Sequence, residues 1–134
     1  MRYLFDTDVI SALVRRGALT RLHQRLARVP AESQCTTTIT LGELSYGAHK
    51  ARRPDLYARI RSILDQVAIL GFDVAAAETY GPLRARLESR GVSVGEADLR
   101  IACIALVNDC TLVTGNVRHF TRIDELKVEN WLDA

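Results

Sequence analysis

The stretch Tyr3-Leu4-Phe5-Asp6-Thr7-Asp8 decides how this chain folds, because a short apolar run ends directly at two carboxylates. The run from Tyr3 to Phe5 predicts a buried strand, and helical spacing of apolar residues begins directly behind Asp8. In a parallel α/β sheet, ligands bind in the crevice at the carboxyl ends of the strands. The opening stretch therefore predicts a site at that edge of a sheet.

Beyond this stretch, predicted strands and helices alternate along the chain. The further predicted strands are 35–39, 68–72, 111–114 and 127–131. The predicted helices follow Asp8 as far as Gly17, span 18–29, open at Thr40, span 54–67, follow Asp73 and run from about Glu96 to Asn108. Such alternation implies parallel pairing, so we expect an α/β fold, a three-layer α/β/α sandwich with a central, mainly parallel sheet. We expect residues 1–134 to form a single domain, because this length supports one core.

Composition places the chain among ordinary globular proteins, with 48% hydrophobic and 25% charged residues. The longest apolar run, Ile101 to Val107, is much shorter than the roughly 20 residues that span a bilayer. We therefore expect a soluble, cytoplasmic protein with no membrane partner. Cys35, Cys103 and Cys110 are odd in number and form no C-x-x-C pair, so we interpret them as core residues rather than as a disulfide framework or a zinc site. The net charge of +2 permits contact with phosphates without requiring it.

Three further polar residues, Glu43, Asp98 and Asn116, stand at later element boundaries. Taken singly, the acids have structural explanations: Asp6 could cap the first helix, and the spellings Thr40 to Glu43 and Ser93 to Glu96 match capping boxes. Capping does not explain why all of these residues fall at the same predicted edge of the sheet. We therefore expect Asp6, Glu43, Asp98 and Asn116 to converge.

Carboxylate and amide oxygens without histidine suit a hard cation such as Mg²⁺, for which Mn²⁺ can substitute, rather than Zn²⁺. A carboxylate-held Mg²⁺ usually serves phosphate chemistry, because it polarises a phosphoryl oxygen and lowers the pKa of a bound water. The predicted site is therefore a magnesium centre for phosphate chemistry.

Four motifs now occur in order over essentially the whole chain. They are Phe5-Asp6-Thr7-Asp8, Thr40-Leu41-Gly42-Glu43-Leu44, Gly95-Glu96-Ala97-Asp98-Leu99 and Leu112-Val113-Thr114-Gly115-Asn116. Together they closely resemble the PIN-domain ribonucleases, and in particular the VapC toxins of bacterial type II toxin–antitoxin pairs.

The resemblance implies a Mg²⁺-dependent endoribonuclease with Asp6, Glu43, Asp98 and Asn116 as its catalytic set. Asp6 and Asp98 would be the metal ligands, and the accessory residues would be Asp8, Glu96 and Thr114. Relatives often carry Asn at the position of Asp8, so Asp8 is expected to orient Asp6 or a metal-bound water, whereas Glu96 is balanced between a cap and an accessory ligand. His119 stands where many relatives have Asp or Glu, and we interpret it as a surface residue.

The resemblance also implies partners: an RNA substrate, a cognate antitoxin and a second copy in a homodimer. An antitoxin segment would lie over the predicted helices 18–29 and 54–67. Arg118, two residues beyond Asn116, is expected to contact an RNA phosphate. The row Arg21, Arg25 and Arg28 is interpreted instead as a solvated helix face.

Two other functions compete with this interpretation. A haloacid-dehalogenase-type phosphatase also begins with a strand and D-x-D, but it needs a downstream lysine, and Lys50 and Lys127 fit that role poorly. A catalytically inactive PIN-like binding module would keep the acids as helix caps. Loss of all affinity for Mg²⁺ would favour the binding module.

Overall fold

A five-stranded sheet forms the centre of the computed structural model, which describes residues 1–15 and 20–132. The strands are β1 (Arg2–Phe5), β2 (Gln34–Thr37), β3 (Ala68–Leu70), β4 (Cys110–Val113) and β5 (Val128–Glu129). Their order is β3-β2-β1-β4-β5, and every neighbouring pair is parallel. All carboxyl ends therefore lie at one edge, as the alternation of elements predicts.

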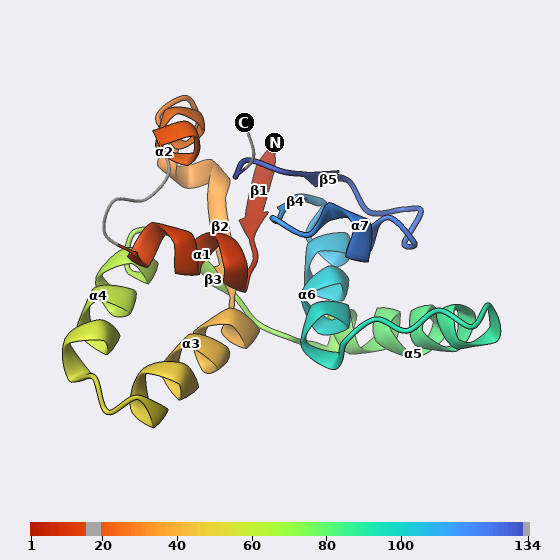
Figure 1. The fold of residues 1–134 in the computed structure, drawn as a ribbon. Helices are drawn as coiled ribbons and strands as arrows, with labels where there is room; N and C mark the ends of the chain where they lie inside the picture. The colour runs from red at the N-terminus through yellow and green to blue at the C-terminus, as the bar shows by residue number, and fades with distance from the viewer. Residues whose placement is uncertain (16–19, 133–134) are drawn as a thin grey trace.

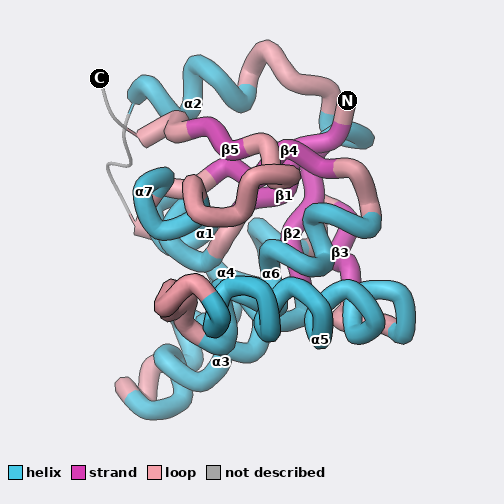
Figure 2. Tube along the Cα trace, turned by 90° about the vertical axis from the view of Figure 1, so that its right-hand side faces the viewer, coloured by secondary structure: helices cyan, strands magenta, loops and turns pink. Residues whose placement is uncertain are grey.

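Helices cover both faces of this sheet (Figure 1). On one face lie α1 (Thr7–Val14), α2 (Thr20–Leu26), α3 (Thr38–Lys50) and α4 (Pro54–Leu64). On the other lie α5 (Val74–Ser89), α6 (Glu96–Val107) and α7 (Val117–Phe120), and Figure 2 views the molecule from this side, with α5 across the front. A 3-10 turn, η1 (Ala31–Ser33), precedes β2. The predicted three-layer α/β/α sandwich is confirmed.

Two cores fill the space between the layers, because successive side chains of a strand point to opposite faces. Phe5 and Val113 join the core beneath α1 to α4, whereas Leu4 and Leu112 join the core beneath α5 and α6. All three cysteines are buried and free, which agrees with their interpretation as core residues. No described helix is long and apolar enough to cross a membrane.

Trp131 ties the end of the chain to the sheet. Its fully buried ring packs on Tyr3 and Phe5, with ring centroids 5.0 and 5.5 Å away. The indole N–H donates a hydrogen bond of 3.0 Å to the Glu129 carboxylate, and the Arg25 guanidinium lies 4.7 Å from the ring centroid. Trp131 thus anchors the end of the described chain to β1.

Two predicted capping boxes are wrong. The helix expected to open at Thr40 begins at Thr38, because the hydroxyl of Thr37, the last residue of β2, accepts the N–H of Thr40 at 3.1 Å and caps α3. Glu43 consequently lies in the second turn, not the first. At α6 the cap is Gly95, without a side-chain hydrogen bond, so Ser93 caps nothing and Glu96 completes no box.

Other boundary predictions fare better. Asp73 caps α5 by accepting the N–H of Ala76 at 2.9 Å, Pro54 opens α4, and Gly91 follows α5 at φ +69°. Pro82 lies inside α5. The predicted stop at Gly17 lies outside the described residues, and α7 was not predicted.

Replacing Trp131 should be costly because its ring fills the space between β1 and the tail. We expect Trp131→Ala to lower the free energy of unfolding by about 3–5 kcal/mol, the usual cost of truncating a buried aromatic residue. Tyr46→Ala is the matched control, since 65% of Tyr46 is exposed and its loss should cost little. Urea denaturation of both variants measures the difference, and equal costs would contradict the anchoring role.

Candidate active site

The predicted polar residues converge on one pocket of about 240 Å³ at the carboxyl edge of the sheet. Its lining consists of Asp6, Thr7, Asp8, Glu43, Asp98, Asn116 and Phe120. In Figure 1, β1 points toward the region where α3 and α6 begin, so each element delivers its acid to the same place. The predicted convergence of Asp6, Glu43, Asp98 and Asn116 is confirmed.

Asp6 is the most buried acid of this pocket, with only 4% of its surface exposed. It follows β1 and caps α1, and its Oδ1 accepts the N–H of Val9 at 3.0 Å. Burial raises the pKa of Asp6 to about 6, although hydrogen bonds from Thr114 and Val9 pull it down; the charges of Asp8 and Asp98 raise it further. Asp6 is therefore both a cap and a member of the site.

Glu43 is held by a hydroxyl that the sequence interpretation missed. Thr7 Oγ1 donates a hydrogen bond of 2.6 Å to Glu43 Oε1, and it also lies 3.1 Å from the hydroxyl of Thr40. Thr7 stands between the two acids of the opening motif, and Thr40 begins the motif that contains Glu43. The threonine hydroxyls at positions 7 and 40 were the sequence feature that could have indicated this contact with Glu43.

Asp98 faces a histidine for which no catalytic role was predicted. Burial is the main cause that raises the pKa of Asp98; the charges of Glu43 and Asp8 add to the rise, and His119 opposes it. His119 Nε2 lies 3.2 Å from Asp98 Oδ2, as an electrostatic contact without the alignment of a hydrogen bond. With 31% of its side chain exposed, His119 reaches the surface, and it also borders the site.

The carboxylates are otherwise unbalanced by protein cations. Among the described residues, no Arg or Lys side chain pairs with Asp6, Asp8, Glu43 or Asp98, and no three His, Cys, Asp or Glu side chains are close enough together to form a ready-made ligand cluster. Mg²⁺ often keeps several waters and contacts only one or two carboxylates. The all-oxygen donors that line the pocket fit such a cation.

The accessory residues separate into two groups. Thr114 is fully buried directly after β4, where it supports Asp6 and accepts the N–H of Asn116 at 3.0 Å. Glu96 lies outside the pocket, because its carboxylate accepts the Tyr80 hydroxyl at 2.7 Å and pairs with Arg84 at 3.0 Å. The structure therefore places Thr114 behind the site and directs Glu96 away from it.

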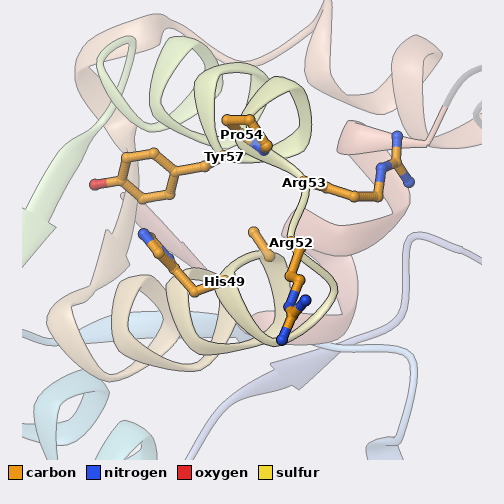
Figure 3. Close-up of a pocket in the computed structure, with 6 residues that line it drawn as sticks. His49, Arg52, Arg53, Pro54 and Tyr57 are labelled. Carbon is orange, nitrogen blue, oxygen red and sulfur yellow. The ribbon is translucent and has the colours of Figure 1, made fainter.

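Two other hollows lie on the α3–α4 side. A groove of about 700 Å³ runs between α1, α3 and α4 and reaches Glu43. A smaller pocket of about 250 Å³ lies at the turn between α3 and α4, where the rings of His49 and Tyr57 meet edge to face with centroids 5.1 Å apart (Figure 3). No carboxylate lines the smaller pocket, so it lacks the donors of the site above.

Comparisons with known proteins agree with this geometry. The PIN domain family model matches residues 3–126. Ribonuclease VapC2 of Haemophilus influenzae is 32% identical over 98% of this chain and 99% of its own length, and the tRNA(fMet)-specific endonuclease VapC of Salmonella typhimurium is 37% identical over 98% of both. In the solved structure of DNA-bound VapBC from Salmonella typhimurium, the matching chain has a TM-score of 0.90 at 30% identity over 98% of both chains. The matched length, the shared fold and the acidic pocket lead to one conclusion: this chain belongs to the PIN-domain family, among its VapC ribonucleases.

Proposed function

We propose that this chain is a Mg²⁺-dependent endoribonuclease toxin that hydrolyses RNA phosphodiester bonds at the acidic pocket. The observation that carries the proposal is the gathering of four carboxylates at the carboxyl edge of the sheet, with no Arg or Lys partner among the described residues. A cluster of like charges raises its own free energy, and a divalent cation offsets that cost. Mn²⁺ would substitute because it accepts the same oxygen ligands.

Asp6 and Asp98 are the proposed cation ligands. When bound, Mg²⁺ would supply polarisation of a phosphoryl oxygen and activation of water. The N–H of Val9 and the hydroxyl of Thr114 hold the Asp6 carboxylate in one orientation. His119 offsets part of the charge of Asp98.

The remaining residues act on the substrate side of the pocket. Thr7 occupies Glu43 Oε1, which leaves Oε2 available to accept a hydrogen bond or a proton from the attacking water. Asp8 would hold a water or orient Asp6, as the sequence suggests. The side-chain amide of Asn116 can donate to a phosphoryl oxygen at the rim.

The haloacid-dehalogenase alternative loses its support. The family match is to PIN domains, and no lysine lines the acidic pocket of the described structure. Lys50 instead lies over the ring of Tyr46 on α3. The inactive binding module is the remaining competitor, and the experiments below distinguish it.

A cognate antitoxin is the proposed protein partner, since solved relatives are VapBC toxin–antitoxin complexes. The α4 side of the 700 Å³ groove, with Leu56, Arg59 and Ile60, offers the surface for its segment. The predicted helix 18–29 is less suitable as an antitoxin surface, because Leu22 of α2 is buried in the protein's own core. A homodimer is also proposed, and light scattering of the purified chain would measure it.

Brief expression without antitoxin, followed by mapping of cellular RNA ends, tests the activity. We expect cuts that carry 5′-phosphate and 3′-hydroxyl ends, because water rather than the ribose 2′-hydroxyl attacks, and we expect chelator to abolish cleavage in vitro. Transfer RNA is the first candidate, given the relatives named for tRNA(fMet). A 2′,3′-cyclic phosphate would exclude this mechanism.

Asp98→Asn separates a cation site from a structural cap. In chelator the variant should melt at or above the parental temperature, because the substitution removes like-charge repulsion. The parent should gain about 2.7 kcal/mol when Mg²⁺ is at about 100 times its Kd, and the variant much less, with RNA cleavage lost. Asp73→Asn, outside the pocket, is the control that should keep the full response. A destabilised Asp98→Asn that still responds to Mg²⁺ and cuts RNA would make Asp98 structural.

The raised pKa of Asp6 predicts an unusual pH dependence. The folded protein binds the extra proton between the ordinary pKa of 3.8 and about 6, so in chelator its free energy of unfolding should fall as pH rises through that window. The fall attributable to Asp6 is up to about 3 kcal/mol. Asp6→Asn keeps a capping oxygen and should flatten the profile. Urea denaturation across this range measures both proteins, and parallel profiles would refute the assignment.

A further inference from the structure

A second hollow of about 350 Å³ lies directly beside the acidic pocket. Its lining consists of Gly91, Val92, Ser93, Asn116, Arg118, His119 and Arg122. Asn116 lines both hollows, and His119 touches Asp98 of the acidic pocket. The two spaces are therefore adjacent parts of one surface, one acidic and the other basic.

The two arginines of this hollow have no internal partner. The side chains of Arg118 and Arg122 are exposed and make no ion pair or hydrogen bond within the described residues. The arginines of the neighbouring α5 and α6 are all engaged by carboxylates. Those pairs are Arg84 with Glu88 at 3.1 Å, Arg86 with Glu125 at 2.7 Å, and Arg100 with Glu96 at 3.3 Å. On this side of the acidic pocket, Arg118 and Arg122 are thus available to an external anion.

An RNA strand approaching four carboxylates meets repulsion on every phosphate. A cation in the acidic pocket would offset this only for the phosphate that is cut, so the next phosphate needs positive charge from elsewhere. Arginine suits this task, because its planar guanidinium binds phosphate oxygens in pairs and remains charged at every relevant pH. The hollow also has room for about ten water volumes, enough for a phosphate with part of its ribose.

We propose that this hollow, which we name the Arg118–Arg122 subsite, binds a non-scissile phosphate next to the phosphodiester that is cut. Arg118 and Arg122 supply the charge, and the Asn116 amide lies at the passage to the acidic pocket. The inference rests on the proposed RNA cleavage, and it adds where the bound RNA lies next to the acidic pocket. Arg122 is then a substrate-positioning residue, for which the sequence alone gave no indication.

Binding of a fluorescent single-stranded oligoribonucleotide, measured in chelator over a range of salt concentrations, tests the charge. Arg122→Gln should weaken binding about five- to tenfold at low salt and reduce the slope of log K against log salt by about 0.7, the value of one phosphate contact on a single strand. Arg118→Gln should behave alike, and Arg122→Lys should keep the slope. Arg28→Gln is the matched control, since it removes one exposed charge from the turn after α2 and should leave the slope unchanged.

A neutral linkage in the same probe tests the location. Replacing one phosphate at a time by methylphosphonate should reveal one position at which the neutral linkage weakens binding to the parent. The same linkage should not weaken binding to Arg122→Gln any further, because both changes remove the same contact between Arg122 and that phosphate. With Mg²⁺, Arg122→Gln should raise KM for RNA and leave kcat within about twofold.

The outcomes separate the two proposals. If the parent neither binds nor cuts RNA, the proposed function fails and the subsite fails with it. The subsite alone is wrong if the parent cuts RNA while Arg122→Gln keeps the parental salt slope. It is also wrong if Arg28→Gln reduces the salt slope as much as Arg122→Gln does. Thermal melts of each variant verify that these exposed substitutions leave the fold intact.

Discussion

The fixed end of β1 is the constraint on which the site depends. β1 lies between β2 and β4, and its last residues are bound from both sides: the Asp6 N–H donates to the Val113 carbonyl at 3.2 Å, and the Thr36 hydroxyl donates to the Phe5 carbonyl at 2.7 Å. The strand therefore ends at one defined point. Since α1 begins at the next residue, Asp6 must lie at the carboxyl edge whatever the other helices do.

Stability and function oppose each other at this point. A buried carboxylate with a raised pKa destabilises the folded chain near neutral pH, and no Arg or Lys of the described residues neutralises it. The surroundings limit the cost through polar contacts, with Val9 and Thr114 on Asp6 and Thr7 on Glu43. These contacts orient the oxygens while leaving the charge in place, which is what a cation ligand requires.

The charges around the pocket are also arranged to keep its carboxylates free of Arg and Lys partners among the described residues. Glu96, which belongs to the same motif as Asp98, is turned outward and is neutralised by Arg84 and Arg100. His119 faces Asp98, and its neighbours Arg118 and Arg122 have no ion-pair partner in the part of the chain that the structure describes. The negative charge thus lies in the pocket, and positive charge lies on both sides of His119 in the chain, at Arg118 one residue before it and at Arg122 three residues after it. This arrangement of charges suits a polyanion with one phosphate that reacts at a cation in the pocket and other phosphates that contact the arginines.

The sequence by itself determined the layered fold and the four residues that meet. Alternating apolar strands and amphipathic helices permit little besides parallel pairing, and parallel pairing brings Asp6, Glu43, Asp98 and Asn116 to one edge. Only the tertiary structure decided which way each side chain points. Glu43 and Glu96 share a capping-box spelling, yet one enters the pocket beside Thr7 and the other leaves it for Tyr80 and two arginines. The motif limits only the local backbone, whereas the direction of each side chain depends on partners elsewhere in the fold: Thr7 is 36 residues from Glu43, and Tyr80 is 16 residues from Glu96.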